Sequence, residues 1–193
     1  MIGEENGLTI GHNSRLLNEL EEILKNGVAG DIADIGCWKG TLSFLMAQIL
    51  LKYNSQKTIY LYDTFCGHDQ SQIKDIDKKW GFINNLDYFK TPSIEHIEQT
   101  FSKLNFTNYV IVKGDVGQTL VNAPSLSFAS LDLNLYEPTS ISLSILKDKL
   151  VSNGIIIEDD YNNITGITEA FNKCDWLKIK KEYTSGASFV WKN

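Results

Sequence analysis

Three aspartates follow two apolar runs in the second half of the chain. Asp132 comes directly after residues 127–131, and Asp159 and Asp160 come directly after 154–158. If the two runs are neighbouring parallel strands, the three carboxylates converge at one edge of a sheet, where they repel one another. Oxygen ligands of this kind suit Mg²⁺ or Ca²⁺, and a bound divalent ion lowers the pKa of a hydroxyl group, with Asp132 available as the general base. The alternative is that these acids are solvated and cap the helices that follow.

A turn with two glycines follows an earlier apolar run at 31–36. Gly36 and Gly40 stand four residues apart. Asp34 precedes them, and Thr41 begins a segment of helical period. The glycines let the backbone turn tightly and approach a ligand at a helix N-terminus, although the spacing is not the GxGxxG of a pyrophosphate cradle. An ordinary strand-to-helix turn is the alternative interpretation.

Two further acids follow apolar runs in the first half of the chain. Asp63 comes after 58–62, and Asp115 comes after 109–113 and a glycine. A carboxylate at the tip of the second strand can accept both hydroxyls of a ribose, and Asp115 would lie beside the adenine edge of the same nucleoside. A turn or helix-capping role is the alternative for Asp63.

Short runs rich in Ile, Val and Tyr alternate with longer segments of helical period. This order predicts βα units around a mostly parallel sheet with helices on both faces, and the last two strands form a hairpin with a turn at 184–186. A parallel sheet that ends in a helix and an antiparallel hairpin is typical of the Rossmann-like class I methyltransferase fold, an α/β fold with seven strands. Strands are predicted at 31–36, 58–62, 109–113, 127–131, 154–158, 177–182 and 187–192, and helices at 13–25, 41–53, 93–104, 139–150 and 165–173.

The ligand of such a sheet binds beyond the carboxyl ends of the strands, where the strand order reverses. In a class I methyltransferase this ligand is S-adenosylmethionine. Its methionine part suits the glycine turn, with Asp34 near its cationic groups. A nucleotide-dependent dehydrogenase is disfavoured, because GxGxxG is missing and the hairpin is present. The predicted cofactor-binding residues are Asp34, Gly36, Gly40, Thr41, Asp63 and Asp115.

The length of 193 residues predicts one domain, 1–193. Within it, 1–29 is expected to be an N-terminal covering segment. The segment 66–92 is polar with isolated aromatic residues, and a loop of this length predicts a substrate lid. We expect His68, within this lid, to be solvated, although it could assist proton transfer.

Composition and charge narrow the class of protein. The chain is 42% apolar and 22% charged, as in ordinary soluble globular proteins. Its net charge of -6 disfavours nucleic acid and anionic membrane surfaces as partners. Residues 1–13 lack the basic and apolar regions of an export signal, and no run approaches about 18 consecutive apolar residues. Three widely separated cysteines predict a reducing, cytoplasmic setting.

Four motifs occur in one order along the chain: GDIADIGCWKG at 30–40, LYDTFCG at 61–67, LDLNLYE at 131–137 and IEDDY at 157–161. Together they resemble the macrocin O-methyltransferase family, magnesium-dependent enzymes that methylate sugar hydroxyls with S-adenosylmethionine. The resemblance implies that Asp132, Asp159 and Asp160 hold Mg²⁺, that Asp132 is the base, and that Asp63 binds the cofactor ribose. It also implies a sugar-like small molecule as substrate, and it leaves a homo-oligomer open.

The chain departs from the family pattern at two site positions. Members usually have Glu where this chain has Asp34, and Asp-Gly-Asp where it has Asp132-Leu133-Asn134. Asn134 keeps an oxygen ligand but removes a charge. Two alternatives therefore stay open: a methyltransferase of the same fold that needs no metal or acts on nitrogen, and a protein that binds the cofactor without transferring its methyl group.

Overall fold

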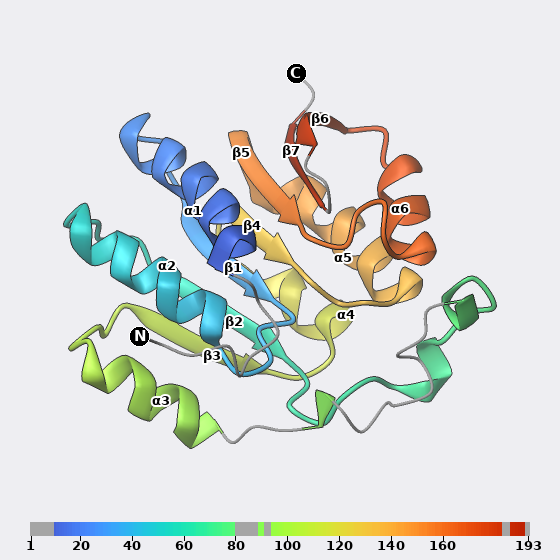
Figure 1. Cartoon of the computed structure of the whole chain (residues 1–193), viewed down its shortest axis with the longest axis horizontal. Helices are drawn as coiled ribbons and strands as arrows, with labels where there is room; N and C mark the ends of the chain where they lie inside the picture. The colour runs from blue at the N-terminus through green and yellow to red at the C-terminus, as the bar shows by residue number, and fades with distance from the viewer. Residues whose placement is uncertain (1–9, 80–88, 91–93, 183–185, 192–193) are drawn as a thin grey trace.

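A seven-stranded sheet forms the centre of the structure, a computed structural model that describes residues 10–79, 89–90, 94–182 and 186–191 (Figure 1). The strand order is β3-β2-β1-β4-β5-β7-β6. The first five strands pair in parallel, whereas β7 runs antiparallel between β5 and β6. This order confirms the predicted methyltransferase fold with its C-terminal hairpin. The strands are β1 (Asp31–Ile35), β2 (Ile59–Asp63), β3 (Tyr109–Lys113), β4 (Leu126–Leu131), β5 (Leu150–Glu158), β6 (Leu177–Glu182) and β7 (Ala187–Trp191).

Helices cover both faces of the sheet (Figure 1). The first three α-helices pack on one face and the last three on the other, and each face has its own cluster of buried apolar residues. The α-helices are α1 (Ile10–Lys25), α2 (Thr41–Lys52), α3 (Ile94–Lys103), α4 (Val116–Thr119), α5 (Tyr136–Lys149) and α6 (Thr165–Asn172). Three 3₁₀ turns complete the described elements: η1 (Gln70–Gln72), η2 (Asp77–Lys79) and η5 (Leu120–Asn122).

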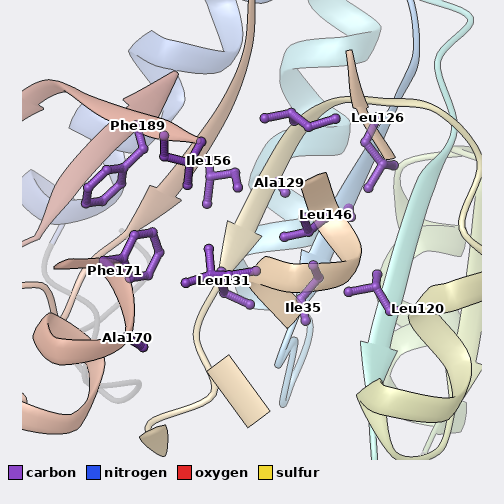
Figure 2. Packing of buried hydrophobic residues seen from close by; sticks show 14 of the residues in the cluster. Ile35, Leu120, Leu126, Ala129, Leu131, Leu146, Ile156, Ala170, Phe171 and Phe189 are labelled. Carbon is purple, nitrogen blue, oxygen red and sulfur yellow. The ribbon is translucent and has the colours of Figure 1, made fainter. Parts of the chain in front are cut away.

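The core is centred on β4, in which all six residues are buried. A parallel strand covered on both faces reads as a continuous apolar run, which is why LSFASL shows no alternation. On one face, Leu131 lies with Ile35 and Ile156 beneath α5 and α6 (Figure 2). Each such side chain contributes roughly 1.5–3 kcal/mol when fully buried. The carboxyl ends of the three strands are thereby fixed relative to one another.

The predicted covering segment 1–29 is described only from residue 10 onward. Within it, α1 buries Leu20 and Ile23 against the sheet. Lys180 of β6 lies 2.5 Å from the carboxylates of both Glu19 and Glu22, so α1 is also tied to the far edge of the sheet.

The structure departs from the predicted elements in several places. The helix expected at 139–150 begins at Tyr136, because Pro138 falls in its first turn, where the missing N–H has no acceptor within the helix. The following strand begins at Leu150 instead of residue 154. The short helix α4 was not expected, since four residues are too few to show a period. The predicted turn at 184–186 lies mostly outside the described residues.

Among the residues that the structure describes, no helix combines the length and apolar composition needed to cross a bilayer.

Candidate functional site

A cleft opens beyond the carboxyl ends of β1, β2, β3 and β4. Because β1 lies between β2 and β4, the strand order reverses there, and this is where open α/β sheets bind ligands. Four of the predicted site residues line the cleft: Gly36, Asp63, Asp115 and Asp132.

A smaller cleft adjoins the first and shares Gly36 and Asp132 with it. Three more predicted residues, Asp34, Thr41 and Asp159, line this second space. The structure therefore brings seven of the nine predicted cofactor and metal residues to two adjoining clefts at the carboxyl edge of the sheet.

Gly36 is required by a close approach of two strand ends. A Cβ atom at this position would lie 1.9 Å from the carbonyl oxygen of Asp132, and the backbone φ is +85°. The amide of Asp132 also donates to the carbonyl of Ile35 at 2.8 Å. The absence of a side chain at Gly36 thus lets the loop that carries Asp132 lie directly against the glycine turn.

Gly40 and Thr41 begin α2. Gly40 is in the left-handed region at φ 71°, and a Cβ there would lie 3.2 Å from Ile97 of α3. It is not among the residues that line either cleft. Gly40 instead ends the glycine turn and lets α2 pack close to α3. Thr41, the next residue, lines the smaller cleft.

Asp34 is a buried carboxylate at the end of β1, with 2% of its surface exposed. Ser43 of α2 donates its hydroxyl hydrogen to Asp34 Oδ2. Burial raises the pKa of Asp34 to about 6, although the Ser43 hydrogen bonds oppose this rise, and the charge of Asp63 adds to it. A group with this pKa changes its charge close to neutral pH.

Asp63 combines a turn role with a place in the cleft. Its Oδ2 accepts from the amide of Trp38 at 2.8 Å, and its Oδ1 accepts from the amide of Phe65 at 2.7 Å. Both donors have positive φ, 44° for Trp38 and 54° for Phe65, so the carboxylate stabilises two strained turns. Each carboxylate oxygen can accept a second hydrogen bond, which leaves acceptor capacity toward the cleft.

Asp115 likewise serves two contacts. Its Oδ1 accepts from the amide of Gly117 at 2.9 Å and so caps α4, while its Oδ2 accepts from the Gln72 side chain at 2.8 Å. Gln72 comes from the segment that was predicted to be a lid. The acid that was predicted to bind adenine therefore lies in the cleft, where it accepts a hydrogen bond from a residue of the predicted lid.

Asp132, Asp159 and Asp160 lie together, as predicted. One carboxylate oxygen of each falls within 4.8 Å of the others, and all three side chains are half-buried. They converge because β4 and β5 are neighbours, with Ser130 in register with Ile157. Burial and then the neighbouring negative charges raise the pKa of Asp132 well above its usual range. Asn134 donates its amide hydrogen to Asp132 Oδ1 at 2.5 Å.

Asp159 and Asp160 precede α6, the helix that the alternative interpretation has them cap. The residue before α6 is Ile164, whose own side chain makes no capping hydrogen bond. Instead, the buried Glu158 accepts from the amide of Asp160 at 2.8 Å and shapes the loop that presents the two aspartates. Burial, followed by the charges of these neighbours, also raises the pKa of Glu158 well above its usual range.

Aromatic residues that the sequence did not assign to the site form one wall of the cleft. The rings of Trp38 and Phe89 lie 6.0 Å apart, edge to face, and the ring of His68 lies 4.9 Å from Phe89. All three line the cleft. The expectation that His68 is solvated is wrong, because the side chain is half-buried and burial lowers its pKa. In the sequence, the signal for this wall was the presence of isolated aromatic residues in the segment 66–92, which has no helical or strand period. Only the fold shows that these rings lie in contact.

Several curated proteins are similar to this chain. It is 28% identical over 154 residues to demethyldecarbamoylnovobiocin O-methyltransferase of Streptomyces niveus, a match that covers 74% of this chain and 56% of that protein. It is 26% identical over 149 residues to 8-demethyl-8-(2,3-dimethoxy-alpha-L-rhamnosyl)-tetracenomycin-C 4'-O-methyltransferase of Streptomyces olivaceus, covering 74% of this chain and 57% of that protein. The chain thus spans little more than half the length of these relatives.

Solved structures share the fold. The O-methyltransferase NovP superposes with a TM-score of 0.85 and 22% identity, over 95% of this chain and 81% of that chain. CalS11, the calicheamicin methyltransferase, superposes with a TM-score of 0.81 and 20% identity, over 95% of this chain and 80% of that chain. The sequence pattern of the macrocin-O-methyltransferase (TylF) family matches residues 7–182 of this chain. Because this match includes the glycine turn, the strand-end acids and the acidic cluster in their observed order, the chain belongs to the macrocin-O-methyltransferase (TylF) family.

Proposed function

We propose that this chain is an S-adenosylmethionine-dependent O-methyltransferase that methylates a hydroxyl group of a sugar or a sugar-containing small molecule, with help from a divalent cation. One observation carries the proposal. The cleft that holds Asp63 and Asp115, two acids suited to a nucleoside, also holds Asp132, which belongs to the three-carboxylate cluster. A donor site and an acceptor site therefore adjoin. The names of the similar proteins, one of which is the 4'-O-methyltransferase of a rhamnosyl tetracenomycin, support the sugar hydroxyl as the acceptor.

The donor side of the cleft fits a cationic nucleoside. Asp63 has acceptor capacity for the ribose hydroxyls, and Asp115 can accept from the exocyclic amine of adenine. Asp34 lies behind the glycine turn and favours the positive charge of the methionine part when it is ionised. S-adenosylmethionine, when bound, supplies a methyl group on a sulfonium, a reactive electrophile with a neutral thioether as its leaving group.

The acceptor side fits a hard cation. Three carboxylate oxygens within 4.8 Å of one another match the ligand type of Mg²⁺. Burial and then the repulsion between these carboxylates raise the pKa of Asp132, and a cation would offset the repulsion. Mg²⁺, when bound, supplies Lewis-acid activation by lowering the pKa of the acceptor hydroxyl. Asp132, Asp159 and Asp160 would hold it.

The protein's own groups then position the reactants and move one proton. Asp132 accepts the proton of the acceptor hydroxyl, while Asn134 fixes the orientation of its carboxylate through the bond to Oδ1. The acceptor oxygen forms its bond to the methyl carbon as the carbon–sulfur bond breaks, and the electron pair of that bond stays on sulfur. We propose that the segment 66–92 is a substrate lid, and that its residues His68 and Phe89, together with Trp38 of the glycine turn, exclude water from this in-line geometry.

Asn134 favours a second candidate function. It occupies a position where the family usually has a second acid, and it donates to Asp132 instead of adding a charge to the cluster. A protein that binds S-adenosylmethionine without transferring its methyl group would keep the donor cleft and lose metal affinity. We propose a cytoplasmic setting in either case, on the basis of the free cysteines Cys37, Cys66 and Cys174.

Calorimetric titration of the metal-stripped protein tests the proposal. We expect S-adenosylmethionine to bind at micromolar strength, and Mg²⁺ to bind to the wild type but not to Asp159→Asn. Asp175→Asn is the matched control, because its side chain is 88% exposed and pairs only distantly with Lys147, at 3.9 Å. Folded protein that does not bind the donor would refute the methyltransferase function. Donor binding without metal binding would favour the second candidate or a metal-independent reaction.

A further inference from the structure

Asp77 is a buried carboxylate that the proposed reaction does not use. It begins η2, inside the segment 66–92, and none of its surface is exposed. Its Oδ2 accepts from the amide of Lys74 at 2.9 Å, which closes a turn within the segment. Its Oδ1 accepts from the amide of Tyr136, the first residue of α5, at 2.9 Å. Asp77 therefore caps α5 from a distant part of the chain.

The same carboxylate contacts the start of α6. A Cβ atom on Gly166, the second residue of α6, would lie 2.4 Å from Asp77 Oδ1 and 3.2 Å from the Cβ of Tyr136. A glycine is thus needed for α6 to reach the bond between Asp77 and Tyr136. Beside this point, Lys74 forms an ion pair with Glu137 at 2.8 Å. The lid segment, α5 and α6 meet at one buried acid.

The loops of the acidic cluster lead directly into these two helices. Residues 132–135 connect β4 to α5 and begin with Asp132. Residues 159–164 connect β5 to α6 and begin with Asp159 and Asp160. The N-termini of α5 and α6 therefore set where the two loops end, and both N-termini rest on Asp77. On the other side, the lid segment reaches the cofactor cleft through the bond from Gln72 to Asp115.

We infer that Asp77 is a positioning residue that couples the placement of the lid segment 66–79 to the geometry of the three-carboxylate cluster. The inference rests on the proposed function insofar as the cluster binds a divalent cation. The carboxylates must be held close together against their mutual repulsion, so the loops that carry them need fixed ends. Asp77 contacts the N-termini of both α5 and α6, where these loops end, and Asp77 itself belongs to the lid segment.

Binding of Mn²⁺ to the full-length protein tests the coupling without any assay of activity. Titration followed by electron paramagnetic resonance reports the free Mn²⁺ concentration. We expect Asp77→Ala to weaken Mn²⁺ binding by roughly tenfold or more, as is typical when a group that supports metal ligands is removed. Asp77→Asn keeps one acceptor oxygen and should restore part of the affinity. Asp75→Asn is the control, because this acid lies in the same segment with 95% of its side chain exposed.

Gly166→Ala provides a test that leaves the charge of Asp77 in place. The added methyl group crowds Asp77 Oδ1, while alanine is a better helix former than glycine. We expect weaker Mn²⁺ binding together with faster hydrogen exchange of amides in the lid segment. If Asp77→Ala does not fold, this variant decides the question. Unchanged Mn²⁺ affinity in folded Asp77→Ala or in Gly166→Ala would overturn the inference.

Hydrogen exchange on metal-free protein separates this inference from the proposed function. If the wild type binds no Mn²⁺, the metal part of the proposed function fails, and the coupling is judged by exchange alone. We expect Asp77→Asn, but not Asp75→Asn, to speed exchange in peptides that cover 132–136 and 160–166 as well as 70–79. An increase confined to 70–79 would show that Asp77 stabilises only its own segment, and would overturn the coupling.

Discussion

Ser43, in the first turn of α2, donates its hydroxyl hydrogen to Asp34 at the end of β1, and both side chains are buried. This bond stabilises the ionised form of a carboxylate whose burial favours the neutral form. The balance holds the pKa of Asp34 at about 6. The charge behind the glycine turn is consequently sensitive to pH near neutrality.

Donor binding should depend on this charge. Asp34 is ionised above pH 6 and attracts the cationic donor, so lowering the pH through about 6 protonates it and weakens binding, by up to about tenfold per pH unit. Ser43→Ala removes a hydrogen bond that lowers the pKa, and we expect the loss of affinity to begin about one pH unit higher. Calorimetric titration with S-adenosylmethionine between pH 5 and 8 measures both curves.

Two variants check the assignment of this pH dependence. Asp34→Asn should bind the donor more weakly at pH 7 and show no loss of affinity through pH 6. His68→Gln tests a second ionisable group of the cleft, whose pKa burial lowers, and should leave the curve in place. A curve that follows His68 instead of Asp34 would contradict the prediction.

Mg²⁺ should stabilise the folded protein through the acidic cluster. At a concentration of about 100 times its dissociation constant, a ligand that binds only the folded state adds about 2.7 kcal/mol to the free energy of unfolding, which raises Tm by about 5–10 °C in a chain of this length. We expect this shift in the wild type and in Asp175→Asn, its disappearance in Asp159→Asn, and its reversal by a chelator. Equal shifts in all three proteins would indicate a different site.

The glycine turn offers a matched pair of substitutions. Gly36→Ala would place a Cβ 1.9 Å from the carbonyl oxygen of Asp132, and we expect it to lower the free energy of unfolding by more than about 3 kcal/mol. Gly27 also has positive φ, at +61°, but nothing lies within 4 Å of its Cβ position. Gly27→Ala should therefore cost only about 1–2 kcal/mol, the cost of a left-handed backbone alone. Chemical denaturation measures the free energy of unfolding of both variants. Similar decreases would show that the close approach of Gly36 to Asp132 does not contribute to stability.

Asp63 should affect both stability and donor affinity. Asp63→Ala removes the acceptor for the amides of Trp38 and Phe65, and we expect a loss of about 2 kcal/mol in the free energy of unfolding. Donor affinity should fall at least about thirtyfold, since the ribose loses a charged acceptor as well. Denaturation and donor titration on the same preparation give the two values.

Lys57→Met is the control for a loss of stability alone. Lys57 Nζ donates to the carbonyls of Val28 and Gly30 and to the hydroxyl of Ser127, at the edge of the sheet opposite the cleft. We expect a similar loss of about 2 kcal/mol with unchanged donor affinity. If Lys57→Met weakened donor binding as much as Asp63→Ala, the effect of Asp63 would be attributed to stability.

The local sequence pattern was sufficient for most of the fold. Apolar runs and helical periods predicted the sheet and its hairpin, because period and turn composition are local properties. The same reasoning placed acids after successive strands. Since parallel strands end at a common edge, Asp63, Asp115 and Asp132 could be expected in one cleft. The family resemblance added specificity through four short motifs, and the family match confirms it.

The sequence could not determine contacts between segments that are distant along the chain. Nothing local distinguishes Asp77 from the exposed Asp75 two residues earlier, yet only Asp77 reaches the amide of Tyr136. His68 looked like a solvated loop residue until the fold placed it beside Phe89. The residue types and their order thus determined which strand ends carry charged side chains, because side-chain chemistry and hydrophobic period can be read from short stretches of sequence. Only the tertiary structure decided which of those acids are buried and which distant side chains, such as Gln72, bind them, because burial and hydrogen bonding depend on residues that are far apart in the sequence.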